Sequence, residues 1–181
     1  MSIVAFDGSH ILYDGICVGG VGGSRQFHVD KVRVSNDKRF VACSVGVWGV
    51  ACAVTQEFFD MLEEAPDRLA NKMFFPVTPL DESIREEYSG DIYIIDNDLQ
   101  CIWMYDEYAN GFGRIPLEPF VIGHERAMAT VILSLGAVSA DKWDKMVFDL
   151  HMVAMSHHFN DRVTAPPYKL LSLSTGEEKA L

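Results

Sequence analysis

The first strands of this chain are apolar on both faces, and this constrains the fold more than any other feature of the sequence. Residues 3–6 form a continuous apolar run, and Asp7 and Gly8 supply a turn. Residues 10–18 return as a second, mostly apolar strand. A strand with apolar residues on both faces belongs to a sheet that is covered on both sides. The chain is therefore expected to stack its sheets between other layers.

The remaining elements are predicted to alternate hairpins with two pairs of helices. Periodicity and turn residues predict hairpins at 27–34 with 39–45 and at 91–95 with 100–105, helices at 47–64, 67–74, 127–136 and 139–154, strands at 120–122 and 168–173, and an irregular segment at 108–119. This order predicts an α+β fold, a four-layer αββα sandwich of two sheets with a helix pair outside each. We expect one domain over residues 1–174, followed by a polar tail at 175–181.

Composition excludes several classes of protein. Hydrophobic residues make up 49% of the 181 residues, which is typical of a packed globular fold. The formal net charge of −11 argues against a nucleic-acid partner, which requires a basic face. The sequence contains no apolar run of 18 residues and no signal-peptide pattern, so we expect no membrane span. Cys17, Cys43, Cys52 and Cys101 lack metal-binding spacing and indicate buried, reduced thiols in a cytoplasmic protein.

The N-terminus offers a nucleophile and a base on one residue. If Met1 is removed, Ser2 carries both a hydroxyl and a free α-amine, which can take the hydroxyl proton. A nearby lysine ammonium would lower the pKa of that amine and stabilise developing negative charge. Asp14 lies in an apolar strand, where a carboxylate is costly unless it is paired. Lys31 is its candidate partner, and a purely structural ion pair is the alternative interpretation.

Several segments together resemble one protein family. They are residues 2–8 (Ser-Ile-Val-Ala-Phe-Asp-Gly), 11–14 (Ile-Leu-Tyr-Asp), 30–33 (Asp-Lys-Val-Arg), 40–46 (Phe-Val-Ala-Cys-Ser-Val-Gly), 120–124 (Phe-Val-Ile-Gly-His) and 136–140 (Gly-Ala-Val-Ser-Ala). In order and spacing they resemble proteasome β-type subunits, which are N-terminal nucleophile hydrolases. The similarity is greatest to short bacterial and phage proteasome-like proteins, including the peptidase subunit of the bacterial ATP-dependent heat-shock protease. It spans about residues 2–158.

The resemblance implies a role for each matching residue. Ser2 occupies the position of the family's N-terminal threonine nucleophile, and Lys31 and Asp14 match the lysine beside it and the aspartate that supports this lysine. Cys43 occupies the position of a glycine whose backbone N–H serves the oxyanion hole. Val41 and Val45 match positions that line the pocket for the residue before the scissile bond.

The resemblance also implies substrates and partners. Gly19 and Gly20 begin a glycine-rich loop that would pair with the backbone of an extended peptide. The expected substrate is a peptide or an unfolded protein, and the expected assembly is a homo-oligomeric ring with an ATPase as a possible partner. The chemistry requires no cofactor. His151 and His158 lie on one face of a predicted helix without a third ligand at telling spacing, so no metal site is expected.

Departures from the family pattern keep two alternatives open. Serine replaces threonine at residue 2, and His124 stands where the family has a serine. Around His157 the supporting aspartate and serine of the family are not identifiable. The main expectation is a serine-type N-terminal-nucleophile peptidase. The alternatives are a catalytically inactive proteasome-like assembly or binding protein and a small-molecule amidase of the same fold.

Overall fold

The computed structural model describes residues 3–19, 25–64, 69–81, 90–123 and 168–180. The chain divides into two compact units, one of residues 1–31 with 118–181 and one of residues 32–117. The predicted helices at 127–136 and 139–154 lie outside the described residues, and so do Ser2, Gly20, His124, His151, His157 and His158. The predicted domain of residues 1–174 stays a prediction.

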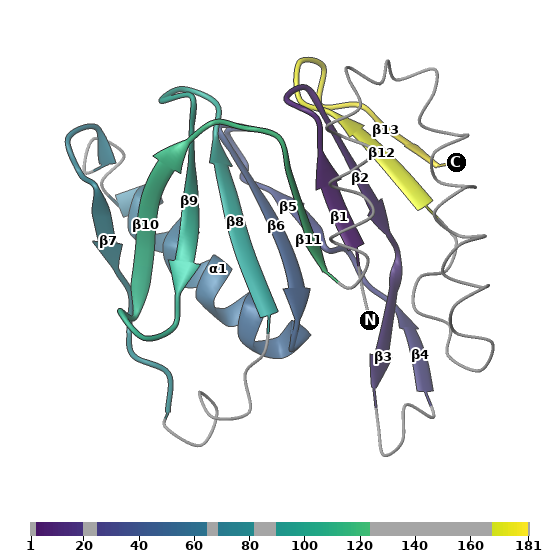
Figure 1. Ribbon diagram of the computed structural model, residues 1–181, viewed down its shortest axis with the longest axis horizontal. Coiled ribbons are helices and arrows are strands. Elements are labelled where there is room, and N and C mark those ends of the chain that lie inside the picture. The colour runs from purple at the N-terminus through teal and green to yellow at the C-terminus, as the bar shows by residue number, and fades with distance from the viewer. Residues whose placement is uncertain (1–2, 20–24, 65–68, 82–89, 124–167, 181) are drawn as a thin grey trace. The chain divides into compact units, whose positions relative to one another are not determined.

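The first unit contains an antiparallel sheet of five strands (Figure 1). Its strands, in sheet order, are β11 (Phe120–Gly123), β1 (Ile3–Phe6), β2 (His10–Asp14), β12 (Tyr168–Ser172) and β13 (Glu178–Ala180). The predicted β1–β2 hairpin and the predicted strands at 120–122 and 168–173 are confirmed. β2 lies between β1 and β12 and is therefore paired along both edges, and its residues 11–14 are buried.

The β1–β2 turn is fixed by one carboxylate. The Asp7 Oδ1 atom accepts hydrogen bonds from the backbone N–H groups of Ser9 and His10, at 2.8 and 2.7 Å. Gly8 takes a φ of 104°, which is a left-handed conformation that glycine adopts without a steric penalty. On either side of the turn, Val4 and Ile11 are fully buried. The turn residues and the apolar runs that the sequence predicts therefore both stabilise the β1–β2 hairpin.

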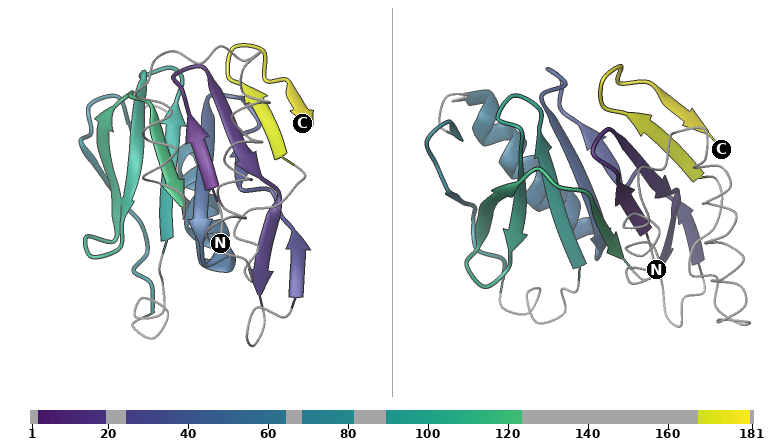
Figure 2. Two further views of the ribbon diagram at one scale, coloured as in Figure 1. Left: turned by 45° about the vertical axis from the view of Figure 1, so that its right-hand side comes forward. Right: turned by 45° about the horizontal axis from the view of Figure 1, so that its top comes forward.

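The expected polar tail contains a strand. β13 pairs with β12 in the register Leu171–Glu178 to Lys169–Ala180 (Figure 2). Every residue of β13 is exposed. Gly176 closes the connecting turn, since its N–H donates to the Ser172 carbonyl at 2.8 Å. The strand has no apolar face, so periodicity gives no sign of it. Its pairing rests on backbone hydrogen bonds and on side-chain contacts with residues far away in the sequence.

Residues 16–34 correct two strand predictions. The strand expected at 10–18 breaks at Gly15, and β3 (Ile16–Gly19) pairs with β4 (Arg25–His28) as a separate two-stranded sheet (Figure 2). The strand expected at 27–34 also divides, because β4 pairs with β3 whereas β5 (Val32–Val34) pairs with β6. Lys31 lies in the bend between β4 and β5. A continuous apolar pattern does not reveal that two halves of a segment have different partners.

The second unit contains an antiparallel sheet of six strands (Figure 1). In sheet order the strands are β5 (Val32–Val34), β6 (Phe40–Gly46), β8 (Gly90–Asp96), β9 (Cys101–Asp106), β10 (Gly111–Pro116) and β7 (Phe74–Pro76). The predicted hairpins around residues 35–38 and 96–99 are confirmed as β5–β6 and β8–β9. β6 lies between β5 and β8, so it is paired along both edges.

One helix packs on this sheet. α1 (Trp48–Glu64), predicted at 47–64, contacts β6 and β8 (Figure 1). Phe58 is the centre of the packing, with ring centroids 4.7 Å from Phe112, 5.4 Å from Phe75 and 5.8 Å from Phe40. The alternate residues of β6, including Val41, are also buried. Strands that are apolar on both faces are therefore buried on both faces, as the sequence pattern predicts.

Two segments of the second unit differ from the prediction. Of the helix expected at 67–74, residues 67 and 68 lie outside the described residues, Leu69 is 3₁₀-helical, and no α-helix follows before β7 begins at Phe74. The irregular segment expected at 108–119 contains β10, which pairs with both β9 and β7. Gly111 and Gly113 interrupt the apolar pattern of β10, so the sequence resembles a loop.

Gly111 is expected to be intolerant of any side chain. A Cβ atom at Gly111 would lie 2.4 Å from Phe74 Cζ and 2.6 Å from the Phe75 carbonyl oxygen. The oxygen belongs to the paired strand and cannot move without disturbing the ladder. We expect Gly111→Ala to lower the free energy of unfolding by about 1–3 kcal/mol, the usual cost of overpacking. The matched control is Gly113→Ala, whose Cβ would meet only the Met104 carbonyl at 4.0 Å. Equal urea-unfolding midpoints for the two variants would contradict this account.

Candidate functional site

A buried ion pair joins two of the predicted site residues. The Lys31 Nζ atom lies 2.6 Å from Asp14 Oδ1, and the side chains of Lys31 and Asp14 are 3% and 0% exposed. Asp14 is the last residue of β2, and Lys31 lies in the bend after β4. The pairing of the Asp14 carboxylate that its apolar surroundings demanded is therefore observed.

The pair lies at the end of the sheet where β1 begins. The β1–β2 register pairs Val4 with Tyr13, and one further step places Asp14 across from Ile3. The Asp7 N–H donates to the His10 carbonyl, and alternate pairs of an antiparallel ladder share this bonded geometry. By that alternation the backbone groups of Asp14 face β1. The ion pair thus lies opposite the first described residue of the chain, which follows Ser2 directly.

A second buried carboxylate in this chain, Asp96, belongs to an ion pair with a structural role. Asp96 is fully buried and receives two hydrogen bonds of 3.0 Å from the Arg39 guanidinium. Its Oδ1 atom also accepts the N–H groups of Asp98 and Leu99, so it closes the β8–β9 turn. A two-point arginine pair of this kind fixes geometry. Lysine is a compact cation whose pKa responds to burial, and catalytic sites use it for that reason.

Three more of the predicted site residues lie on β6 in the second unit. Val41, Cys43 and Val45 are all buried and share one face of the strand, since they alternate along it. Burial raises the pKa of the Cys43 thiol far above its ordinary value. The thiol is therefore protonated at neutral pH and is not a rival nucleophile.

The ladder alternation sets the direction of each backbone N–H along β6. The Asn97 N–H donates to the Arg39 carbonyl, so the pairs Val41–Ile95 and Cys43–Tyr93 share its bonded geometry with β8. The N–H of Cys43 accordingly faces β8, and that of Ser44 faces the β5 side. The sequence could not supply this distinction, because it depends on the registers of β6 with β5 and with β8.

The predicted peptide-binding loop is described only at its start. Gly19 ends β3 and is paired with Arg25 of β4. Gly20 lies outside the described residues, as do Ser2 and the positions of His124 and His157. The structure therefore brings Asp14 and Lys31 into contact and aligns Val41, Cys43 and Val45 on one strand.

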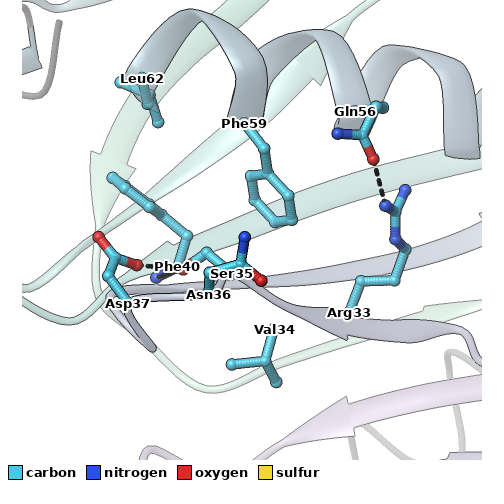
Figure 3. Close-up of a pocket in the computed structure, with 9 residues that line it drawn as sticks. All are labelled: Arg33, Val34, Ser35, Asn36, Asp37, Phe40, Gln56, Phe59 and Leu62. Atoms are coloured by element: carbon cyan, nitrogen blue, oxygen red, sulfur yellow. Dashed lines mark hydrogen bonds between the residues drawn. The ribbon is translucent and has the colours of Figure 1, made fainter. Parts of the chain in front are cut away.

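A pocket of about 320 Å³ lies beside α1 in the second unit. Figure 3 shows its lining, which consists of Arg33, Val34, Ser35, Asn36, Asp37, Phe40, Gln56, Phe59 and Leu62. The Arg33 guanidinium donates to Gln56 Oε1 at 2.5 Å and lies over the Phe59 ring at 5.9 Å. The pocket contains none of the residues that the sequence predicts for catalysis or substrate binding.

Sequence reasoning missed a second polar network in the first unit. The Tyr13 hydroxyl donates to Glu178 Oε2, and Lys169 Nζ contacts Asp30 Oδ1 at 2.8 Å and Glu178 Oε1 at 3.1 Å. Tyr13 precedes Asp14 and Asp30 precedes Lys31 in the chain. The four residues come from distant segments, so no local motif signals their contact.

Two features are absent from the residues that the structure describes. Among residues 3–19, 25–64, 69–81, 90–123 and 168–180, no three His, Cys, Asp or Glu side chains gather as metal ligands would. In the same part of the chain, no helix has the length and apolar character needed to cross a membrane.

Solved structures share this fold. Eukaryotic HslV from Trypanosoma brucei is 14% identical to the chain, with a TM-score of 0.57, and the match covers 93% of this chain and 96% of that protein. Anbu, an ancestral beta-subunit from Yersinia bercovieri, is 12% identical, with a TM-score of 0.58 and coverage of 99% and 86%. No protein-family model and no curated protein matches the sequence. At this identity the likeness shows the fold alone, which is the proteasome-like fold that the sequence resemblance implies.

Proposed function

We propose that this chain is a proteasome-like N-terminal nucleophile peptidase whose nucleophile is Ser2 after removal of Met1. The observation that carries the proposal is the buried Asp14–Lys31 pair, which lies across from Ile3 at the start of β1. Ser2 directly precedes Ile3 in the chain, so this position of the pair supports a lysine that acts on the α-amine and hydroxyl of Ser2. The fold shared with HslV and Anbu supports the same reading.

The proposed reaction needs no cofactor. The Ser2 Oγ attacks the peptide carbonyl carbon, and the Ser2 α-amine takes the hydroxyl proton. The tetrahedral intermediate collapses to an ester, and the ammonium returns the proton to the leaving amine. Water, deprotonated by the same amine, then hydrolyses the ester and regenerates Ser2. Each step conserves the proton between hydroxyl, amine and leaving group.

Lys31 and Asp14 have separate roles in this scheme. The Lys31 ammonium lowers the pKa of the Ser2 α-amine, whose reference value is about 7.7–8.0, so that the amine is a free base near neutral pH. It also stabilises the negative charge that develops on the substrate. Asp14 keeps the lysine paired and oriented, because an isolated buried ammonium would be costly.

The oxyanion donor is proposed to be a backbone N–H of β6, and two neighbouring residues are candidates. The resemblance implies the N–H of Cys43. The alternation along β6 favours the N–H of Ser44, because the Cys43 N–H faces β8. Val41 and Val45 are proposed to line an aliphatic pocket for the residue before the scissile bond. Gly19 and Gly20 are proposed to pair with the backbone of the extended substrate.

The proposal extends to architecture and assembly. The two sheets with flanking helices form a four-layer αββα sandwich in a single domain, in a cytoplasmic homo-oligomeric ring that an ATPase feeds with unfolded protein. Size-exclusion chromatography with light scattering tests the ring. A monomer or dimer would instead favour the small-molecule amidase, which needs no enclosed chamber.

The intact mass of the purified chain is the first test of the nucleophile. Before incubation the mass is expected to equal the sequence without Met1, and a serine-acylating peptide probe is expected to add one adduct. Peptide mapping should place it on Ser2. Ser9→Ala is a matched control, because Ser9 is an exposed serine of the β1–β2 turn whose hydroxyl lies 2.8 Å from His10 Nδ1. Retained Met1 without an adduct would contradict the peptidase and favour the inactive assembly protein.

A further inference from the structure

The C-terminal strand β13 is tied to the residues that flank the ion pair. Glu178 of β13 accepts a hydrogen bond from the Tyr13 hydroxyl and contacts Lys169 Nζ at 3.1 Å. Lys169 also donates to Asp30 Oδ1 at 2.8 Å, and its ammonium lies 5.8 Å from the centroid of the Tyr13 ring. Tyr13 and Asp30 are the chain neighbours of Asp14 and Lys31. One network therefore contacts the residues immediately before both members of the pair.

The strand register places the network and the ion pair on opposite faces of the sheet. Lys169 lies across from Tyr13, and Glu178 lies across from Leu171, so the side chains of Tyr13, Lys169 and Glu178 share a face. The Asp14 side chain points to the other face, because successive residues of a strand alternate. The network can therefore hold the backbone next to Asp14 and Lys31 from the opposite face of the sheet.

The network includes Asp30, a residue whose side chain is largely exposed to solvent. The Asp30 side chain is 69% exposed, and Lys169 is the partner that ties it to the sheet. The hydrogen bond to Asp30, followed by that to Glu178, holds the pKa of Lys169 above its ordinary value, although partial burial opposes the rise. The ammonium thus stays charged at neutral pH and keeps both carboxylates in place.

We propose that Glu178 and Lys169 are positioning residues that hold Tyr13 and Asp30, and through them the Asp14–Lys31 pair, in place. This inference rests on the proposed function, since it gives the C-terminal strand a role at the proposed catalytic site. Side chains that hold reacting groups in register have large kinetic effects, because a displacement of about 1 Å costs about a hundredfold in rate. β13 then helps to hold the proposed site in place, although it lies far from Asp14 and Lys31 in the sequence.

The test compares two neighbouring glutamates. Glu178→Gln keeps size and removes the charge that binds Lys169 and Tyr13, whereas Glu177→Gln makes the same change at an exposed residue of the preceding turn. We expect Glu178→Gln to lower the rate of Ser2 acylation by about tenfold, between no effect and the roughly hundredfold cost of a 1 Å displacement. We expect it to change the pH profile, and Glu177→Gln to match the unchanged chain. Lys169→Met should resemble Glu178→Gln, and Lys169→Arg should restore most of the rate.

A second readout does not depend on activity. In protein labelled with ¹³C-lysine, the Lys31 side-chain signal can be assigned by its loss in Lys31→Arg. We expect this signal and its pH titration to change in Glu178→Gln and to stay unchanged in Glu177→Gln. The charged group in contact with Lys31 is Asp14, whereas Asp30, Lys169 and Glu178 belong to the network.

The two readouts separate the two proposals. If the unchanged chain is never acylated, the proposed function fails, and the Lys31 signal still decides whether Glu178 positions the pair. If Glu178→Gln alters only the melting temperature and leaves the Lys31 signal and the acylation profile as they were, the network is purely structural and the inference is overturned.

Discussion

Replacement of Lys31 with methionine is expected to lower the free energy of unfolding by about 3–5 kcal/mol, the usual cost of breaking a buried ion pair from one side. Methionine fills a similar volume but leaves the Asp14 carboxylate without the ammonium 2.6 Å away. Asp14 is fully buried, so water cannot replace the lost partner without a rearrangement. Urea unfolding followed by circular dichroism measures the change.

The double variant Asp14→Asn with Lys31→Met provides the control. Removal of both charges leaves no unpaired ion, so most of the lost stability is expected to return. Activity should not return, because the lysine that is proposed to tune the Ser2 amine is still absent. A double variant that regains both stability and Ser2 acylation would contradict the catalytic role of Lys31. A loss of less than about 1 kcal/mol in Lys31→Met would resemble an exposed pair and contradict the burial.

The elements that the sequence predicts correctly are those defined by local signals. The β1–β2 hairpin follows from an apolar run on each side of Asp7 and Gly8, and α1 follows from its apolar periodicity. The Asp14–Lys31 contact was predictable because a carboxylate in a doubly apolar strand demands a cation, and the family pattern supplied the candidate. The hairpin and the helix are each signalled within one short segment, whereas the partner of Asp14 was supplied by the family pattern.

The elements that the sequence misses depend on partners far along the chain. β10 is a strand because β9 and β7 lie on either side of it, although its glycines give it the pattern of a loop. β13 has no apolar residue facing a core and depends on β12 and Glu178 contacts. The break at Lys31 reflects a change of partner from β3 to β6. Periodicity describes one segment at a time and contains no information on which segments pair.

The same limit applies to the site. The resemblance implies that Cys43 is the residue of the oxyanion hole, but a match by position does not show which way its N–H points. The direction follows from two registers, those of β6 with β5 and with β8. The chemistry of a backbone group is therefore set by pairing, whereas the chemistry of Asp14 and Lys31 is set by their side chains and is visible in the sequence.

Replacement of Ser2 with alanine is expected to lower the rate of peptide cleavage and of probe acylation by at least about 10³-fold, because removal of a nucleophile removes the covalent route. Alanine is also a small second residue, so removal of Met1 and the free α-amine are expected to be kept. Only the hydroxyl is lost. The measurement is cleavage of unfolded casein and of short apolar peptides, with intact mass recorded on the same samples.

Ser2→Thr separates loss of the nucleophile from disturbance of the N-terminus. Threonine is the residue that the family resemblance implies at this position, and its hydroxyl can attack in the same way. We expect Ser2→Thr to retain acylation within about 200-fold of the unchanged chain, since one methyl group in a site is worth about 10–200-fold. If Ser2→Ala and the unchanged chain cleave casein equally, Ser2 is not the nucleophile. If both are inert while Ser2→Thr is active, the fold carries the catalytic machinery and the serine is the reason that this chain does not use it.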